Sequence, residues 1–171
     1  MPHNKTLADC MNPQDKSLSR HIRKATPNDI DQISAIEKKC FEGPRAYAKR
    51  RLAYLALEAN STCLVMTEEG DILGFIIVLY RKGSCIANIE TIDVDPQFQK
   101  QGIGMSLLVA AEADMKKRGM KISQLEVSER NEAAIKLYQK AGYTAKERLI
   151  NYYKFEHCGT RHAIRMVKAL N

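Results

Sequence analysis

The stretch Val94-Asp-Pro-Gln-Phe-Gln-Lys-Gln-Gly-Ile-Gly-Met105 decides the fold of this chain. Residues 87–94, which lead into it, are largely apolar and β-branched, and Pro96 is expected to end this strand because proline cannot donate to a sheet ladder. The stretch therefore predicts a strand, a tight turn, a glycine-rich loop and the start of a helix. Four apolar residues at helical spacing continue that helix: Leu107, Leu108, Ala111 and Met115.

The glycine-rich loop has the pattern Gln99-x-x-Gly102-x-Gly104 and falls where loop becomes helix. A helix N-terminus has free backbone N–H groups and a positive dipole end, and glycines let an anion approach that backbone closely. The pattern predicts a pyrophosphate cradle, and a tight turn with close packing is the alternative. The loop lacks the Gly-Lys-Ser/Thr of a P-loop and the third glycine of a dinucleotide fingerprint, so it leaves the ligand open.

Length and composition indicate one soluble globular domain. The chain has 171 residues, of which 44% are hydrophobic and 27% charged, and no apolar run approaches the roughly 20 residues that cross a bilayer. Residues 1–19 are polar and show no period, so we expect a disordered leader there and a single domain over residues 20–171. The leader has no hydrophobic segment typical of a secretory signal, and we expect the chain to be cytoplasmic.

Cysteine, histidine and charge patterns exclude several classes of function. The five cysteines are scattered and the four histidines form no metal-ligand set, so we expect reduced thiols and no metal. The net charge of +7 is spread along the chain, apart from short runs at 49–51 and 116–118 that are typical of solvated helix faces. Because there is no nucleic-acid motif, this charge argues for a polyanionic cofactor or an acidic partner rather than nucleic acid.

The hydrophobic pattern predicts seven strands and four helices in the order β-α-α-β-β-β-α-β-α-β-β, an α/β fold (α+β under some schemes). The first helix begins at Thr26-Pro27-Asn28-Asp29, where Thr26 is the cap and Asp29 its capping-box partner. The predicted strands cover residues 22–24, 62–67, 72–80, 87–94, 122–128, 143–153 and 162–170, and the predicted helices cover residues 30–40, 45–58, 102–117 and 131–141.

The strand at 122–128 has one polar face. Leu125 and Val127 share one side, and Gln124, Glu126 and Ser128 share the other. A strand between two helical crossovers is normally apolar on both faces, so the polar row indicates an open crevice in which Glu126 could act as a base, directly or through water. A half-solvated sheet face is the alternative.

The following helix carries two further candidates. Tyr138 recurs at core spacing, which is typical of packing with the hydroxyl at a rim. A phenol is also a suitable acid for protonating a leaving thiolate, because its unperturbed pKa lies above that of a thiol. Asn131 would by default be the helix cap.

Three segments together resemble the GNAT superfamily of N-acetyltransferases, in its branch of ribosomal-protein-alanine and other protein N-terminal acetyltransferases. They are residues 92–104, 125–131 and 133–143, and the similarity extends from Ile22 to Leu170. The segment Asn151-Tyr152-Tyr153 points to the N-terminal branch. The resemblance implies a mixed, mostly antiparallel sheet of about seven strands with four helices.

The resemblance also implies an acetyl-CoA site with no metal. Ile92, Asp93 and Val94 would pair with the pantetheine arm as another strand, and the Val94 N–H would polarise the acetyl carbonyl. Asn131 would bind the pantetheine or a nearby group of the cofactor. The pyrophosphate would be held by the loop residues Gln99, Lys100, Gln101, Gly102, Ile103, Gly104 and Met105.

For catalysis, the resemblance implies Glu126 as the general base and Tyr138 as the general acid. The acceptor amine would attack the thioester directly, without a covalent enzyme intermediate. Glu90 is a rival base, because the preceding strand carries a carboxylate in some relatives. Phe41, Tyr152 and Tyr153 match positions that line the peptide entrance.

We therefore expect an acetyl-CoA-dependent N-acetyltransferase that acts on the N-terminal α-amine of a protein or peptide, with a ribosomal protein as one possible acceptor. The segment 41–44 lacks the Phe-Pro pattern usual in this branch, which leaves the peptide specificity open. A GNAT enzyme that acetylates a small-molecule amine and a non-catalytic acyl-CoA-binding module are the alternatives.

Overall fold

The computed structural model describes residues 19–41 and 43–171, so the expected leader lies outside the described residues except for Ser19. These residues form the predicted number and order of strands and α-helices. The strands are β1 (His21–Lys24), β2 (Ser61–Glu68), β3 (Asp71–Tyr80), β4 (Ile86–Val94), β5 (Ile122–Ser128), β6 (Thr144–Leu149) and β7 (Ala163–Ala169), and the α-helices are α1 (Ile30–Cys40), α2 (Lys49–Ala53), α3 (Ile103–Lys117) and α4 (Glu132–Lys140).

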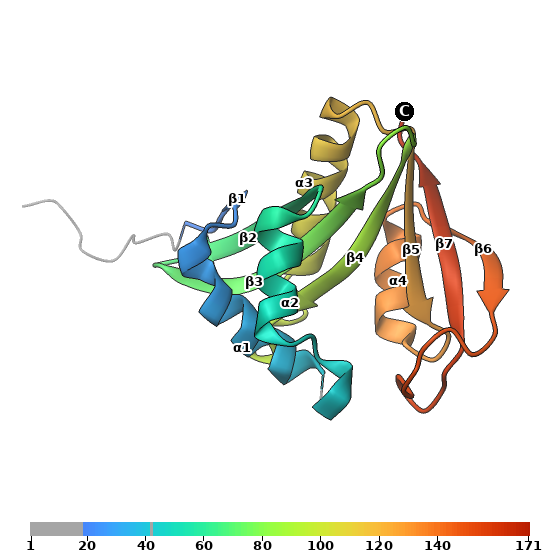
Figure 1. Ribbon diagram of the computed structural model, residues 1–171, viewed down its shortest axis with the longest axis horizontal. Coiled ribbons are helices and arrows are strands. Elements are labelled where there is room, and N and C mark those ends of the chain that lie inside the picture. Colours follow the sequence, from blue (N-terminus) through green and yellow to red (C-terminus); the bar gives the residue numbers. More distant parts are fainter. Residues whose placement is uncertain (1–18, 42) are drawn as a thin grey trace, which may run out of the picture.

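All seven strands form one sheet in the order β1-β2-β3-β4-β5-β7-β6 (Figure 1). Every pair of neighbours is antiparallel except β4 and β5, which are parallel and connected through α3. The prediction of a mixed, mostly antiparallel sheet is therefore confirmed. The β2–β3 hairpin turns through Glu69 and Gly70, both at positive φ, as expected for a tight turn between twisted strands.

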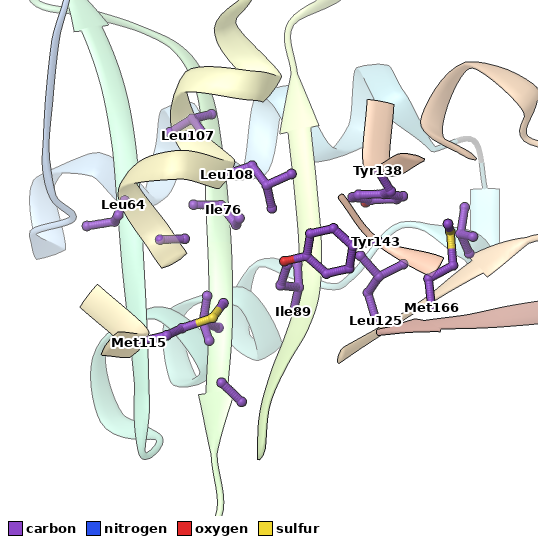
Figure 2. Packing of buried hydrophobic residues seen from close by; sticks show 14 of the residues in the cluster. Leu64, Ile76, Ile89, Leu107, Leu108, Met115, Leu125, Tyr138, Tyr143 and Met166 are labelled. Carbon is purple, nitrogen blue, oxygen red and sulfur yellow. The ribbon is translucent and has the colours of Figure 1, made fainter. Parts of the chain in front are cut away.

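Helices cover both faces of the sheet, and each face has its own core. On one face, α1 and α2 pack over a cluster that includes Ile33, Leu52 and Phe75. On the other face, α3 and α4 pack over a larger cluster, of which Figure 2 shows members from both helices and from the strands. The apolar side chains of β2 and β3 alternate between the two clusters, so these central strands are buried on both faces.

The parallel pair β4–β5 is short, and this opens the sheet. The two strands pair only from Ile86 to Ile89 on β4 and from Ile122 to Leu125 on β5. Beyond these residues they diverge, and Figure 1 shows the separation widening toward the C-terminal ends of both strands. The C-terminal half of β4 therefore keeps β3 as a neighbour but has an open edge toward β5.

A β-bulge at Glu90 sets the direction of the side chains at this open edge. Ile89 pairs with Val78 and Thr91 pairs with Ile77, so Glu90 is the extra residue of β4. The bulge changes which side chains of β4 face the core under α3. Before the bulge these are the odd-numbered Ala87 and Ile89, and after it they are the even-numbered Ile92 and Val94. A step of three between Ile89 and Ile92 in the sequence is the signal that could have predicted it.

Two predicted elements are wrong in extent. The strand expected over 143–153 ends at Leu149, because Asn151 has a φ of 50° and its N–H donates to His162 Nδ1, 3.0 Å away, instead of to a strand. The helix expected over 45–58 begins only at Lys49, because Ala48 is extended, and from Tyr54 it continues as a π-helix. No helix of the described residues is both long and apolar enough to cross a membrane.

Candidate active site

A cleft of about 460 Å³ occupies the space that β4 and β5 leave between them. Both strands contribute to its wall, α4 and the start of α3 line it on one side of the sheet, and the segments after α1 and after β6 line it on the other. The cleft brings together predicted residues from every expected part of the site. Those that line it are Phe41, Glu90, Ile92, Val94, Gly104, Glu126, Asn131, Tyr138, Tyr152 and Tyr153.

The glycine-rich loop ends at the first turn of α3. Gly102 caps the helix at a φ of 81°, and the Ser106 N–H donates to the Gly102 carbonyl at 3.0 Å. The N–H groups of residues 103–105 precede this first helical bond, so they have no partner within the helix. A Cβ on Gly104 would lie 3.3 Å from Leu137 Cδ2, so a side chain here would enter the space between α3 and α4. These features fit a pyrophosphate-binding helix start.

The remaining loop residues differ in where their side chains point. Gln99 Nε2 donates to the Val94 carbonyl at 3.2 Å and so fixes the loop to the end of β4. Gln101 Oε1 accepts from Arg20 Nη2 at 2.7 Å, on the side of β1 rather than in the cleft. Lys100 has a φ of 62°, so the chain turns sharply just before Gly102.

Asp93 lies on β4 between two cleft residues, but its side chain is buried against α1. It is 4% exposed, accepts from Thr91 Oγ1 at 3.2 Å and lies beside Glu37, which is 1% exposed. Burial, followed by the Glu37 carboxylate, raises the pKa of Asp93 well above its usual range. The protonated form of Asp93 is therefore favoured, and any role in cofactor binding falls to its backbone.

Glu126 projects from the polar face of β5 that the sequence predicted. Its Oε1 accepts from Arg165 Nε at 2.8 Å and from Gln124 Nε2 at 3.2 Å, and its side chain is 9% exposed. Leu125 and Val127 lie in the opposite core, as expected. The cross-strand partner Arg165 was missed from the sequence, because nothing in the sequence of β7 alone marks it as the neighbour of Glu126.

Tyr138 and Asn131 reach the cleft from α4. Tyr138 is 6% exposed, its ring lies 5.8 Å from that of Tyr143, and burial raises the pKa of its phenol. It therefore keeps its proton at neutral pH, as a general acid must. Asn131 is the cap of α4, and its Oδ1 accepts from the Ala134 N–H at 3.2 Å. Its position on the cleft wall is compatible with both roles considered for it.

Glu90, the rival base on β4, is held by a tyrosine that the sequence did not indicate. Tyr47 OH donates to Glu90 Oε1 at 2.6 Å, and the Tyr47 N–H donates to Glu37 Oε1 at 2.8 Å. Tyr47 therefore connects the bulge of β4 to α1. Burial, followed by the hydrogen bond to Glu90, raises the pKa of Tyr47, so the phenol is the donor in this contact.

Aromatic rings form the wall on the side of α1. The His157 ring stacks on Tyr153 at 4.2 Å and meets Phe41 edge-on at 5.7 Å, and Tyr153 meets Tyr152 edge-on at 5.0 Å. Burial, followed by the charge of Arg45, lowers the pKa of His157. Burial, followed by the charges of Glu126 and Glu90, raises the pKa of Tyr152. The sequence predicted Phe41, Tyr152 and Tyr153 here but not His157.

Comparisons with known proteins agree with this arrangement. The ribosomal protein bS18-alanine N-acetyltransferase of Escherichia coli K12 is 35% identical over 88 residues, which are 52% of this chain and 58% of that protein. A mycothiol acetyltransferase of Propionibacterium freudenreichii is 25% identical over 151 residues, which are 82% of this chain and 48% of that protein. The chain thus spans about three fifths or less of the length of these curated relatives.

The fold and the family model give the same assignment. The crystal structure of the ribosomal-protein-S18-alanine N-acetyltransferase from Escherichia coli matches with a TM-score of 0.78 at 27% identity, over 90% of this chain and 95% of that one. Residues 30–143, more than half of the chain, match the model of the acetyltransferase (GNAT) family. With its open β4–β5 edge and glycine-bearing helix start, this chain belongs to the GNAT family of acetyltransferases.

Proposed function

We propose that this protein transfers an acetyl group from acetyl-CoA to the N-terminal α-amine of a protein or peptide. The observation that carries the proposal is the composition of the cleft. It joins the N-terminus of α3, the open edge of β4, the carboxylates of Glu90 and Glu126, a buried phenol and an aromatic wall. The similarity to a ribosomal-protein-alanine N-acetyltransferase supports the choice of acceptor.

The residues present fit the cofactor. The free N–H groups at the start of α3 suit a pyrophosphate, and Gly104 leaves room for it beside Leu137. Ile92 and Val94 lie on the strand edge that β5 leaves open, where an extended pantetheine arm could pair with the backbone. When bound, acetyl-CoA supplies a thioester carbonyl as the electrophile and a thiolate as the leaving group.

The chain's own groups provide the proton transfers. An α-amine has a pKa near 8, so at neutral pH it must lose a proton before it can attack a thioester. In our proposal, Glu126 accepts that proton directly or through water, and Tyr138 donates its phenol proton to the departing thiolate. Glu90 is the alternative base, since it lines the same cleft and Tyr47 fixes its side chain.

The aromatic wall favours an acceptor larger than a simple amine. Phe41, Tyr152, Tyr153 and His157 come from two separate segments and enclose the cleft on the side opposite to α3 and α4. Such a wall suits the first side chains of a peptide. A small-molecule amine is the second candidate acceptor, because mycothiol acetyltransferases are among the relatives.

The test is to incubate the protein with acetyl-CoA and a library of peptides with free N-termini, with small amines alongside. We expect acetylation of N-terminal α-amines, located by mass spectrometry. Transfer only to lysine side chains or small amines would overturn the N-terminal assignment. Tight binding of CoA without transfer to any acceptor would instead identify an acyl-CoA-binding module.

A further inference from the structure

Arg165 lies at the centre of a row of charged side chains that crosses three strands. On β7 it is the direct cross-strand partner of Glu126 on β5 and of Glu147 on β6. Its Nε donates to Glu126 Oε1 at 2.8 Å, and its Nη1 donates to Glu147 Oε1. The register therefore links a carboxylate of the cleft to one at the surface.

The two carboxylates differ in how much they depend on Arg165. The side chain of Glu126 is 9% exposed, whereas that of Glu147 is 47% exposed. A charge removed from water is costly unless it is paired, so Arg165 matters for the ionised form of Glu126 far more than for that of Glu147. Each partner raises the pKa of Arg165, Glu126 most strongly, and the guanidinium stays charged.

The contact also fixes the orientation of the carboxylate. Arg165 Nε and Gln124 Nε2 both donate to Oε1, so two donors on one side of Glu126 hold the same oxygen. The other oxygen, Oε2, accepts from neither Arg165 nor Gln124. The Tyr152 phenol and Glu90 are the neighbours of Glu126 on the cleft side. A guanidinium is suited to holding Oε1 because its donors are rigid and it stays charged at neutral pH.

We propose that Arg165 is a positioning residue that holds the Glu126 carboxylate beside a positive charge and orients it for the acceptor amine, and so influences the lowest pH at which transfer proceeds. This inference rests on the proposed function. In the reaction, the ammonium of the acceptor gives one proton to Glu126, its nitrogen forms the new bond to the acetyl carbon, and the bond from that carbon to sulfur breaks. The departing thiolate takes the phenol proton of Tyr138, and the second proton that the nitrogen loses as it becomes an amide returns to the phenol through water. Arg165 gains and loses no proton.

The test is the pH dependence of kcat in Arg165→Met, which keeps the apolar stem of the side chain but removes its charge and donors. We expect the fall of kcat at low pH, the acid limb of the profile, to move to higher pH by about one to two units. This is the usual effect of removing an opposite charge at this distance. Arg165→Lys should restore at least half of the shift, because it returns the charge without the fixed donors. The profile is measured with two acceptors whose amines differ in pKa. An acid limb that stays the same with both acceptors belongs to the enzyme, and one that moves with the amine belongs to the acceptor.

Two matched variants control for a purely structural effect. Arg148→Met removes an arginine that pairs with Glu129 outside the cleft, through Nε at 2.5 Å and Nη2 at 3.0 Å. Glu147→Gln removes the exposed partner of Arg165 and leaves Glu126 paired. Neither should move the acid limb, even where the melting temperature falls.

The outcomes separate this inference from the proposed function. An active wild type whose acid limb stays in place in Arg165→Met and Arg165→Lys would overturn the inference and leave the proposed function intact. A wild type that acetylates no amine would remove the proposed function. In that case, a ¹³C NMR titration of the Glu126 carboxyl still tests the pairing with Arg165. The Glu126 signal is identified because it is missing in Glu126→Gln. An unchanged titration midpoint in Arg165→Met would overturn the inference.

Discussion

Glu126 and Glu90 face one cleft from neighbouring strands, and their partners distinguish them. Glu126 is paired with a guanidinium, whereas Glu90 accepts from a phenol. Both side chains are fixed by these contacts. Arg165 places a positive charge beside Glu126, whereas Glu90 lies on a bulge and its side chain points toward Tyr47.

The first prediction concerns this choice of base. Glu126→Gln should lower the rate of acetyl transfer at least about 100-fold, because the amide cannot accept the amine proton, while the Kd for acetyl-CoA stays within about twofold. Steady-state kinetics and isothermal titration calorimetry measure the two quantities. Glu90→Gln is the matched control and should lose less. A nearly unchanged rate in Glu126→Gln, with a large loss in Glu90→Gln, would transfer the role to Glu90.

The second prediction concerns the phenol of Tyr138. Tyr138→Phe should lower kcat by about 100-fold with little change in KM, because the ring still fills the core but no proton is offered to the thiolate. The rate with a thioester whose thiol is more acidic should fall less, since its leaving group needs no proton. Tyr143→Phe, which alters the neighbouring ring outside the cleft, is the control. Equal losses with both thioesters would show that Tyr138 acts through packing.

At the scale of elements, a substitution at the start of α3 should weaken cofactor binding without a comparable loss of stability. Gly104→Ala adds a methyl group that would lie 3.3 Å from Leu137, on the wall of the cleft. We expect the Kd for CoA to rise at least about tenfold because the methyl occupies the approach to the helix N-terminus. The melting temperature should change little, because the gain of up to about 1 kcal/mol for alanine over glycine in a helix opposes the cost of moving Leu137 away from the methyl group. Unchanged CoA binding would contradict this reading of the loop.

The same elements show which features of the site can be predicted from the sequence. The hydrophobic periods of α3 and α4 and the polar row of β5 predicted helices, a strand and an open crevice, because each depends on local alternation. Which side chains meet in the crevice depends instead on the order and register of the strands. Arg165 meets Glu126 only because β7 inserts between β5 and β6, and no local pattern encodes that order.

The aromatic wall shows a second limit of sequence reasoning. Tyr152 and Tyr153 were expected near the peptide entrance, but as the end of a strand. They lie instead in a loop that begins where Asn151 adopts positive φ, and this loop is long enough to bring His157 onto Phe41. Contacts between two loops depend on the backbone of each, so the position of His157 could be found only in the structure.

At the scale of the whole molecule, buried carboxyl groups couple the fold to pH in opposite directions. Asp93 lies beside Glu37 between β4 and α1, and burial, followed by Glu37, raises its pKa. Asp29 accepts from Arg23 Nη1 at 2.7 Å and from Nη2 at 2.8 Å, and this guanidinium lowers its pKa. Both groups are buried, so both should affect the free energy of unfolding.

The signs follow from proton counting. Above pH 4, folded Asp93 keeps a proton that the unfolded chain releases, so its contribution to stability is lost as the pH rises toward its folded pKa. Asp29 acts in the opposite direction. Its contribution to the free energy of unfolding is present above the pKa that it has in the unfolded chain, and is lost as the pH falls through the pKa that it has in the folded protein. Asparagine titrates in neither state, so it removes each dependence.

Asp93→Asn should therefore be more stable than the wild type at pH 8, and the difference should shrink toward pH 4 by up to about 1.4 kcal/mol per pH unit. The amide can still donate to Glu37 and accept from Thr91, so the packing of α1 on β4 is kept. Asp29→Asn is the matched control and should be less stable at pH 7, with a difference that shrinks in acid. Urea unfolding at pH 4, 6 and 8 measures the Asp93 variant, and urea unfolding at pH 7 and at pH 3 and below measures the Asp29 variant. A destabilised Asp93→Asn at pH 8 would mean that Asp93 is ionised in the folded protein at that pH.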